Sequence, residues 1–464
     1  MEPDGEIQPV DQPDTVTQVP AESSAATIVE DDAGALQDQI AQHSETQYAF
    51  FQHDFTSSPA QLLATTGSKY NTSIVQTLED EKDILQQRIQ QFNIHDGNNH
   101  FRNVKWSPDG TYLLSNSNDN VLRLFSLPYE AYEQEKGPIV ESQALSCQFG
   151  VREGEAVYDF AWFPSMNSQD PASCCFVASV RDHPVHLWDA CTGKLRASYS
   201  VIDHHERFVG PTVVTFNLDG SRIYCGYENM IEIFDIQRPG QESIKIPTLP
   251  TRKSKNGQKG IISCLDFSPD YSGIYAAGSF SQSIGIYEEA SNQLCFKLTG
   301  IQGGVTQVRF SLDGSLLFSA SRVANTISCW DIRSTGNVLY ELPRPGRTNQ
   351  RIHFDLDPSG RVLVTGDQNG QLLFYDVATG YEDSENSSRL LHSFQAHNDL
   401  SCAATFNPVY PWLLASASGQ RKYFVADGQD SDDTDRSVEQ EQIDNSLKIW
   451  HLQGQTQYYT LDAP

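Results

Sequence analysis

The chain has 464 residues and a formal net charge of −28 at pH 7, but residues 1–68 and 427–444 carry −12 and −7 of it, so only −9 belongs to the rest. No apolar run reaches the ~18 residues that cross a bilayer, there is no secretory signal, and nine cysteines without a C-x-x-C spacing predict reduced, buried thiols in the nucleus or cytosol. The acidity excludes neither a basic surface on the central part nor an anionic partner for it.

Residues 1–45 are rich in Asp, Glu, Gln, Pro, Ser and Thr and poor in aromatic residues, which predicts a disordered acidic tail. In residues 46–99, the segments 46–55 (TQYAFFQHDF) and 60–66 (AQLLATT) have the composition of strands. We expect one of them to supply an outer strand that pairs with the last repeat. The three- and four-residue spacing of apolar residues over 74–92 predicts an amphipathic helix that packs on the same domain.

Residues 100–452 repeat one pattern seven times: an apolar strand, a turn such as SPDG, and a later strand that ends in W-D or a related pair. The residues before the turns are Trp106, Trp162, Phe216, Phe267, Phe310, Leu356 and Phe406. The aromatic residues that close the repeats are Phe125, Trp188, Phe234, Tyr287, Trp330, Tyr375 and Trp450. A step of roughly 50 residues with four strands per repeat is typical of WD-type blades. The predicted fold is therefore an all-β, seven-bladed WD-repeat β-propeller.

The seventh repeat contains an acidic, low-complexity insertion over 425–443, which predicts a solvated loop, and residues 453–464 form a C-terminal tail. Four polar residues stand six positions before a closing aromatic residue: Asp119, Asp182, Asn369 and Asp444. We expect their side chains to accept hydrogen bonds from the backbone of a tight turn. His397 lies in the loop that enters the seventh repeat, where WD repeats commonly place a histidine that pairs with such an aspartate.

The sequence contains no recognisable catalytic or metal-binding motif, and we predict no cofactor, no metal and no enzyme activity. A catalytic pair of His397 and Asp444 is the alternative, but the repeat pattern already accounts for both as turn residues. His183 and His186 stand three positions apart on an extended segment, so their side chains would point to opposite faces and would not share a metal.

Basic residues gather in two sets of loops that share one face of a WD propeller, here called the upper face. These loops join successive blades, or join the second and third strands within a blade. They contain Arg181, Arg207, Arg252, Lys253, Lys255, Lys259, Arg322, Arg347, Arg351, Arg421 and Lys422, with the amides Asn349, Gln350 and Gln420 among them. Lys and Arg attract phosphate, and amides and guanidinium planes can contact unpaired bases. An acidic peptide would use the same residues, so composition does not separate RNA from protein.

Several segments go beyond the general repeat pattern. They are VHLWDACTGKLRASY (185–199), NDNVLRLFSLPYEAY (118–132), GIISCLDFSP (260–269), RTNQRIHFDLDPSG (347–360) and LLASASGQRKYF (413–424). On these segments the chain resembles the telomerase Cajal body protein 1 family, the WD-repeat proteins antisense to p53. The resemblance covers roughly residues 100–452, and its TNQR and SGQR segments are the most specific.

The resemblance implies a non-catalytic RNA-binding protein that holds the CAB-box loop of small Cajal body RNAs, and telomerase RNA where a species uses it. It implies retention of these particles in Cajal bodies, and support for the movement of telomerase to telomeres. The implied location is the nucleus, in Cajal bodies, with some protein in the cytoplasm. The implied partners are H/ACA ribonucleoprotein proteins such as dyskerin, coilin, the survival motor neuron protein and the cytosolic chaperonin, with no membrane and no direct DNA contact.

The candidate RNA-binding residues are Arg181, Arg322, Arg347, Asn349, Gln350, Arg351, Gln420, Arg421 and Lys422, with Arg181, Arg322, Arg351 and Arg421 as leading contacts. Arg351 and Arg421 are expected to be exposed. The alternative function is a protein-interaction scaffold for nuclear ribonucleoprotein assembly that does not touch RNA.

Overall fold

The computed structural model describes residues 47–56, 59–67, 99–133, 139, 141–203, 205–251, 254, 256–334, 337–378, 389–421 and 443–460. The predicted acidic tail (1–45), the predicted helix (74–92), almost all of the acidic insertion, and Arg252, Lys253, Lys255 and Lys422 lie outside these residues. The chain divides into two compact units. One is Phe50–Gln457, and the other, Met1–Ala49 with Tyr458–Pro464, is described only at 47–49 and 458–460.

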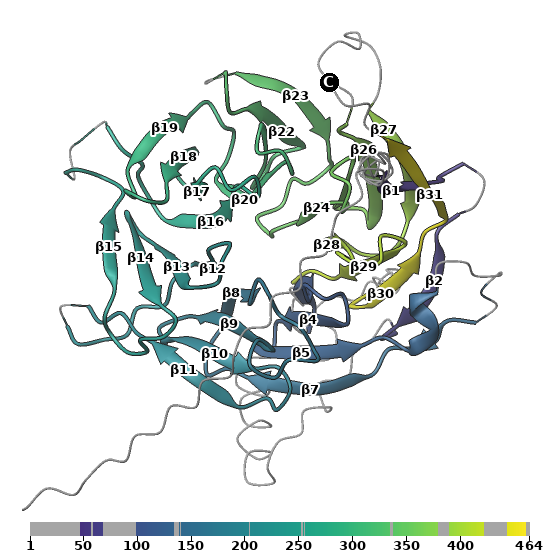
Figure 1. Ribbon diagram of the computed structural model, residues 1–464, viewed down its shortest axis with the longest axis horizontal. Helices are drawn as coiled ribbons and strands as arrows, with labels where there is room; N and C mark the ends of the chain where they lie inside the picture. Colours follow the sequence, from purple (N-terminus) through teal and green to yellow (C-terminus); the bar gives the residue numbers. More distant parts are fainter. Residues whose placement is uncertain are drawn as a thin grey trace, which may run out of the picture. The chain divides into compact units, whose positions relative to one another are not determined.

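The Phe50–Gln457 unit is a ring of seven sheets in which the strands of each repeat pair antiparallel, as the repeats predict (Figure 1). Blade 1 contains β3 (Phe101–Trp106), β4 (Tyr112–Ser117), β5 (Val121–Ser126) and β7 (Cys147–Arg152). Blade 2 contains β8 (Val157–Trp162), β9 (Cys175–Val180), β10 (Val185–Asp189) and β11 (Leu195–Tyr199). Blade 3 contains β12 (Val213–Phe216), β13 (Arg222–Tyr227), β14 (Met230–Asp235) and β15 (Ile244–Pro247).

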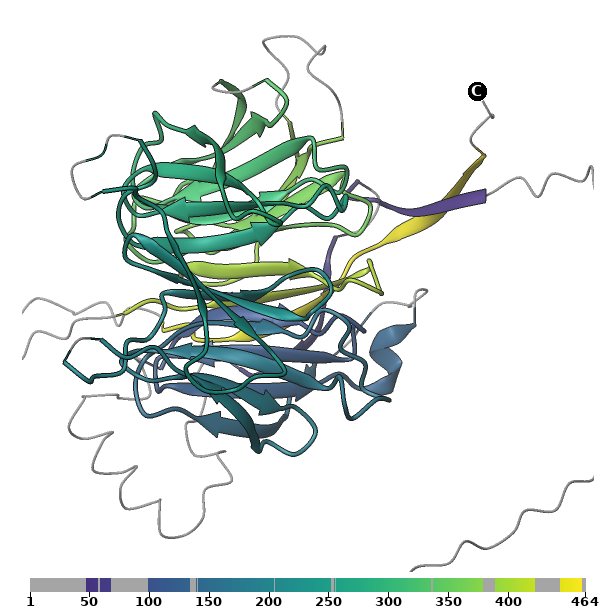
Figure 2. The same ribbon diagram turned by 60° about the vertical axis from the view of Figure 1, so that its left-hand side comes forward.

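The remaining blades follow in the same order, with the first strand of each innermost. Blade 4 contains β16 (Ile262–Phe267), β17 (Ile274–Ser279), β18 (Ser283–Glu288) and β19 (Leu294–Leu298). Blade 5 contains β20 (Val305–Phe310), β21 (Leu316–Ser321), β22 (Thr326–Asp331) and β23 (Val338–Pro343). Blade 6 contains β24 (Phe354–Leu356), β25 (Val362–Gly366), β26 (Gln371–Asp376) and β27 (Leu390–Gln395). The turned view shows the twist of the individual sheets (Figure 2).

Blade 7 is assembled from distant parts of the chain. Its inner strands are β28 (Ser401–Phe406), β29 (Leu413–Ser418) and β30 (Leu447–His451), and its fourth strand is β2 (Gln61–Thr65), which pairs antiparallel with β30. The two lie side by side in purple and yellow in Figure 1. β6 (Gln143–Ala144) adds a parallel fifth strand on β2. β1 (Gln47–His53) pairs with β31 (Gly454–Thr460) in a separate two-stranded sheet.

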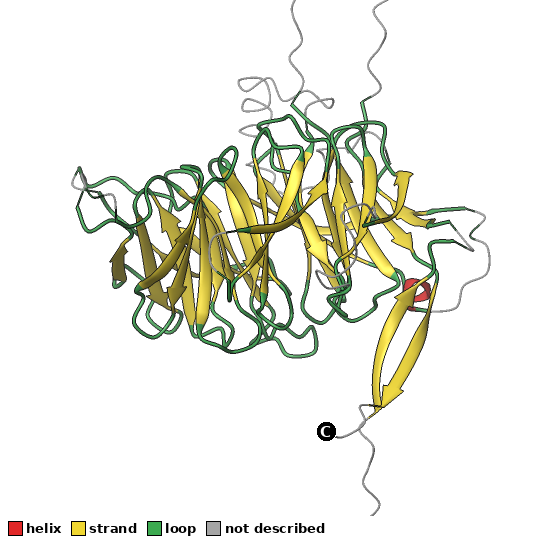
Figure 3. Cartoon of the chain, turned by 90° about the horizontal axis from the view of Figure 1, so that it is seen from above, coloured by secondary structure: helices red, strands yellow, loops and turns green. Residues whose placement is uncertain are grey.

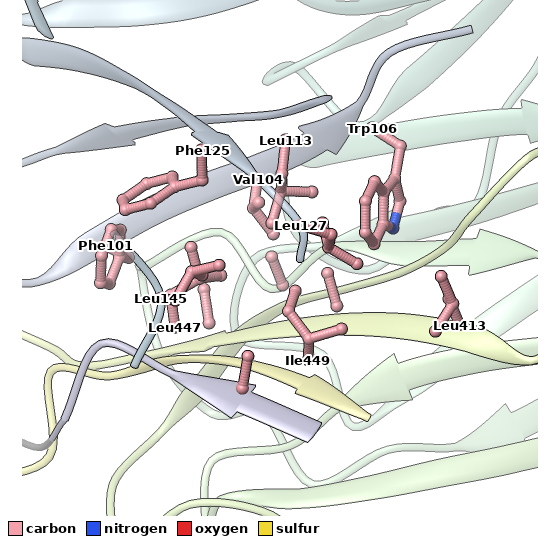
Figure 4. Close-up of a cluster of buried hydrophobic side chains, with 14 of the residues drawn as sticks. Phe101, Val104, Trp106, Leu113, Phe125, Leu127, Leu145, Leu413, Leu447 and Ile449 are labelled. Atoms are coloured by element: carbon pink, nitrogen blue, oxygen red, sulfur yellow. The ribbon is translucent and has the colours of Figure 1, made fainter. Parts of the chain in front are cut away.

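The cores lie between neighbouring blades because alternate residues of each strand face opposite sides of its sheet. The junction of blades 7 and 1 buries side chains of both blades, together with Leu63 and Ala64 of β2, in one hydrophobic cluster (Figure 4). The indole N–H of Trp106 donates to the Thr405 carbonyl across this junction at 3.2 Å. Figure 3 shows that strands dominate the described residues, with one short 3-10 turn at Tyr129–Tyr132.

The recurring polar and glycine residues of the repeat turns stabilise the turns in which they lie. The Asp109 carboxylate accepts hydrogen bonds from Ser107 Oγ at 2.6 Å and the Thr111 backbone N–H at 3.1 Å. Gly110 has φ +72°, a conformation that glycine adopts more readily than residues with a side chain. None of the nine cysteines forms a disulfide: six are buried, as expected, but Cys191 and Cys295 are exposed and Cys147 is half-buried. Cys295 lies on the outer strand β19, which has only one sheet neighbour.

Candidate nucleic-acid interface

Five of the predicted contact residues line a single cavity of about 550 Å³ on the upper face. Arg322 comes from the loop between β21 and β22, and Asn349, Gln350 and Arg351 come from the long loop between β23 and β24. Arg421 follows β29. Residues about 100 positions apart therefore meet because the ring brings loops of blades 5, 6 and 7 to one face.

The remaining wall of this cavity comes from residues that the loop pattern did not reveal. Arg102 stands on the inner strand β3 and Tyr158 on β8, and Phe280 follows β17. The Arg102 guanidinium donates to Asn118 Oδ1 at 2.8 Å. The loop pattern could not identify Arg102, because this residue lies inside a strand, FRNVKW. Phe280 did carry a signal, as an aromatic residue within the polar loop segment SFSQS.

The guanidinium groups of this cavity are close enough to influence one another. Burial lowers the pKa of Arg102, and the neighbouring cations of Arg421 and Arg351 lower it further. Burial also lowers the pKa of Arg322, again with a contribution from Arg351. Four arginines, Arg102, Arg322, Arg351 and Arg421, therefore hold like charges around one hollow, here called the arginine cavity. Such an arrangement favours an anionic ligand.

The acidic residue that lines the arginine cavity already has a cationic partner. Asp159 lines the arginine cavity, and its carboxylate contacts the Lys105 ammonium at 3.0 Å. His353 also lines the cavity, and burial together with the Arg351 cation holds its pKa well below the ordinary value. His353 is therefore neutral at physiological pH and adds no positive charge.

The structure corrects the expected exposure of Arg351. Arg421 is exposed, but Arg351 is half-buried, and its guanidinium donates to the Ser263 carbonyl at 3.2 Å. Arg351, in the loop between β23 and β24, therefore reaches inward to β16, the innermost strand of blade 4. The residue therefore has a fixed position, which a surface arginine on a loop tip would lack.

The three predicted amides differ in their surroundings. The Gln350 amide donates to the Gly419 carbonyl at 2.8 Å and so links the loops of blades 6 and 7. The Gln420 amide donates to Asp399 Oδ1 at 2.7 Å and does not line the arginine cavity. Asn349 is exposed at the cavity wall. Gln350 and Gln420 thus contribute to the shape of the upper face.

Arg181 and Arg347 lie away from the arginine cavity. The Arg181 side chain is 58% exposed and pairs with Asp182 at 3.2 Å. Arg347 is exposed, and its backbone N–H donates to Gln368 Oε1 at 3.1 Å. Both residues belong to upper-face loops, where they add charge at some distance from the cluster of four arginines.

His397 and Asp444 belong to a buried structural lock. Asp444 accepts from the Asn398 backbone N–H at 2.8 Å, and His397 Nε2 contacts Ser416 Oγ at 2.7 Å. Ser416 Oγ also accepts from the Trp450 indole at 2.8 Å. All four side chains are buried. This chain of hydrogen bonds explains both candidate catalytic residues as parts of blade 7.

Two other expected turn locks are wrong. Asp182 is exposed at φ +53° and contacts Arg181, while the Glu153 carboxylate accepts from the Trp188 indole at 2.8 Å and takes over the lock of blade 2. In blade 6 the Asp367 carboxylate accepts from the backbone N–H groups of Asn369 and Gln371, each at 2.8 Å. The charged carboxylate of Asp367, two residues before Asn369, therefore accepts the backbone hydrogen bonds that we expected for the Asn369 side chain.

His183 and His186 have different partners. His183 Nδ1 contacts the Arg181 carbonyl at 2.8 Å, whereas His186 Nδ1 lies 2.9 Å from Glu153 Oε2. Within the described ranges, no group of three or more His, Cys, Asp and Glu residues could hold a metal ion. In the same ranges, no helix has the length and apolar character needed to cross a membrane.

The chain is similar to known WD-repeat proteins. The family model "WD domain, G-beta repeat" matches residues 86–126 and 292–331. Telomerase Cajal body protein 1 of Rattus norvegicus is 38% identical over 325 residues, which cover 70% of this chain and 60% of the rat protein. The human protein of that name is also 38% identical over 325 residues, with 70% and 58% covered.

A fungal protein is also similar to this chain. The Guanine nucleotide-binding protein negative regulator 1 of Schizosaccharomyces pombe is 34% identical over 275 residues, which cover 58% of this chain and 68% of the fungal protein. The chain spans about three fifths of the length of the rat and human relatives.

Proposed function

Because the chain belongs to the WD-repeat family that includes the Telomerase Cajal body protein 1 sequences of rat and human, we propose that it is a non-catalytic RNA-binding scaffold. Its ligand is the CAB-box loop of small Cajal body RNAs, and telomerase RNA where the organism has such a client. It retains these particles in Cajal bodies and supports the movement of telomerase to telomeres. Its partners are dyskerin-like H/ACA proteins, coilin and the survival motor neuron protein, and the cytosolic chaperonin assists its folding.

The observation that carries this proposal is the arginine cavity. Arginine side chains supply the phosphate contacts that dominate RNA affinity, and an RNA loop presents phosphates on a short, unpaired segment. Tyr158 and Phe280 add aromatic rings to the same hollow. Unpaired bases stack on aromatic rings, so these residues support a nucleic-acid ligand in addition to the positive charge.

The first test is crosslinking of the protein to RNA in cells, followed by sequencing of the bound fragments. We expect hairpins with a shared four-nucleotide loop motif to be enriched over total nuclear RNA. Failure of any loop motif to emerge would favour the protein-interaction scaffold. In that case the upper face would bind an acidic protein and would not contact RNA.

The second test changes charge on one face at a time. Arg351→Gln combined with Arg421→Glu should weaken binding to a loop-containing RNA by about 10- to 100-fold, because two phosphate contacts are lost. The matched control is Arg238→Gln with Arg333→Glu. Both control residues are more than 70% exposed and lie in loops between third and fourth strands, away from the upper face.

The control variant should bind RNA as the unchanged protein does, and both variants should stay folded in thermal unfolding. Equal weakening by the two variants would indicate that net charge, and not this face, determines the affinity. Filter binding or fluorescence anisotropy at several salt concentrations provides the measurement.

A further inference from the structure

The Arg322 guanidinium lies directly over the ring of Phe280. The guanidinium carbon is 3.8 Å from the ring centroid, and that of Arg351 is 5.9 Å from the same centroid. At 3.8 Å one face of the Arg322 guanidinium is covered by the aromatic ring. A planar group has two faces, and because Arg322 also lines the arginine cavity, its other face can take a second planar partner there.

The backbone around this pair holds both residues in place. The Arg322 N–H donates to the Gly304 carbonyl at 2.8 Å. A Cβ atom on Gly303 would lie 2.1 Å from the Arg322 carbonyl oxygen, and one on Gly304 would lie 2.9 Å from the Phe280 carbonyl oxygen. The Gly303–Gly304 dipeptide therefore allows a close approach of three backbone segments from two neighbouring blades. Phe280 and Arg322 are positioned by rigid backbone and not only by side-chain contacts.

Arg322 also has an unsatisfied hydrogen-bond donor. Its Nε atom is buried and has no partner among the described residues. A buried N–H group without an acceptor is costly, which is uncommon in folded proteins unless a ligand or water supplies the acceptor. Together with the lowered pKa of Arg322, caused by burial and the Arg351 cation, this marks the side chain as prepared for a ligand.

We propose that Arg322 is the stacking surface for one unpaired base that leaves the RNA loop, with Phe280 as a positioning residue that supports the guanidinium from behind. Arg351 and Arg421 bind the phosphates next to that nucleotide. The volume of about 550 Å³ lies in the range of small-ligand sites and suits a single nucleotide. This inference rests on the proposed RNA-binding function and names the element of the RNA that the cavity takes.

The arrangement selects unpaired RNA by its geometry. A base within a duplex is stacked on its neighbours on both sides and cannot place a face against a side chain, whereas a base in a loop can turn outward. Guanidinium planes stack on every type of base, so Arg322 provides affinity for an extruded base, and the exposed Asn349 amide at the cavity wall is available to contact its edge.

The test uses the full-length protein and RNA hairpins with a randomised four-nucleotide loop, from which the tightest binder is selected. Each loop nucleotide is then replaced in turn by an abasic nucleotide, which keeps the phosphate but lacks the base. We expect one abasic position to weaken binding by about 10- to 100-fold. Arg322→Lys, which keeps the charge and loses the plane, should weaken the intact hairpin to a similar extent.

The decisive comparison combines the protein change with the RNA change. Arg322→Lys should have no further effect on the hairpin that is abasic at the sensitive position, and the slope of affinity against salt should be unchanged. Phe280→Leu should weaken the intact hairpin, while Phe280→Trp should restore binding because it again offers an aromatic face to the guanidinium. A purely structural role of Phe280 would instead weaken the intact and abasic hairpins equally.

Three outcomes would overturn the proposal. Full affinity of Arg322→Lys for the intact hairpin would show that no base stacks on residue 322. Competition by inorganic polyphosphate or a poly-glutamate peptide as effective as that by the hairpin would indicate a plain anion site. In both cases binding of the hairpin by the unchanged protein would leave the proposed function standing. Absence of hairpin binding by the unchanged protein would remove both proposals.

Discussion

At the scale of single residues, the buried polar groups of this propeller have structural tasks that differ from blade to blade. Blade 7 joins four side chains from Asp444 to Trp450. In blade 5 we find the hydrogen bond that corresponds to Trp450–Ser416: the Trp330 indole donates to Ser319 Oγ at 2.9 Å. Blade 1 uses a different pair, because Arg123 contacts Asp119 within the core. The same turn geometry is therefore stabilised by different chemistry around the ring.

This difference gives a prediction within one chain. Ser416→Ala removes the partner of both His397 Nε2 and the Trp450 indole, and should lower the free energy of unfolding by about 3 kcal/mol. Ser319→Ala is the matched control, since it leaves only the Trp330 indole without a partner, and should cost about 1.5 kcal/mol. Urea unfolding measures both. Equal losses would contradict the claim that the Ser416 hydroxyl has two partners, the His397 ring and the Trp450 indole.

At the scale of secondary-structure elements, the important feature is the strand that completes blade 7. β2 pairs with β30 from Gln61↔His451 to Thr65↔Lys448, with an irregularity at Leu63. Leu63 is 4% exposed and packs in the cluster between blades 7 and 1. β2 therefore covers the outer edge of β30 and also contributes to a core, which explains how a short strand can close the ring.

Leu63→Asp tests this closure. A carboxylate buried in the cluster should lower the free energy of unfolding by about 3 kcal/mol or more and should release β2 from β30. The exposed edge of β30 should then pair with other molecules, so light scattering after size-exclusion chromatography should detect concentration-dependent oligomers. Leu195→Asp, on the outer strand β11 at a residue that is 48% exposed, should leave both stability and mass unchanged. A monomeric Leu63→Asp variant would contradict the role of β2.

The sequence predicts the blades and part of the arginine cavity, but not all of the residues that line it. Repeat spacing predicts the seven blades, because each W-D or S-P-D-G pattern is local. The pattern of basic loops also finds Arg322, Arg351 and Arg421. It does not find Arg102, which a strand carries into the same cavity, or the half-buried position of Arg351. Those facts depend on where the ring places one blade against another, and no local pattern contains that information.

At the scale of the whole molecule, the inner strands bring charges from separate blades together in the middle of the ring. Lys105, Asp266, Arg309 and Asp355 each stand one position before the residue that enters the first turn of a blade. Arg309 contacts Asp355 at 3.4 Å. Burial raises the pKa of Asp266 to about 6, with Arg309 and Lys105 opposing the shift and Asp355 adding to it.

The raised pKa of Asp266 predicts a specific pH dependence of stability. The folded state favours the protonated carboxyl, so its contribution to stability is complete below about pH 4 and is lost as the pH rises through 6. Asp266→Asn removes this loss and should gain up to about 3 kcal/mol relative to the unchanged protein between pH 4 and pH 8. Denaturant titrations across this range provide the measurement.

The control variant is Asp313→Asn, for which the stability relative to the unchanged protein should change with pH in the opposite direction. Burial alone would raise the pKa of Asp313, but hydrogen bonds from Ser311 and Ser315 lower it, so its carboxylate stabilises the folded state above the unfolded pKa. Asp313→Asn should therefore lose stability relative to the unchanged protein as the pH rises from 3 to 6. A pH profile of Asp266→Asn parallel to that of the unchanged protein would contradict the assignment.

The pairing of β2 with β30 also has a consequence for the order of events on the ribosome. The Leu447 backbone N–H donates to Thr66 Oγ1, and these residues are separated by 381 positions. β2 is synthesised before every blade and must wait, unpaired, until the last strand of the ring has left the ribosome. Such distant pairing slows folding and exposes strand edges to other nascent chains in the meantime. A folding compartment that encloses one chain at a time would give this protein its greatest benefit at that final step.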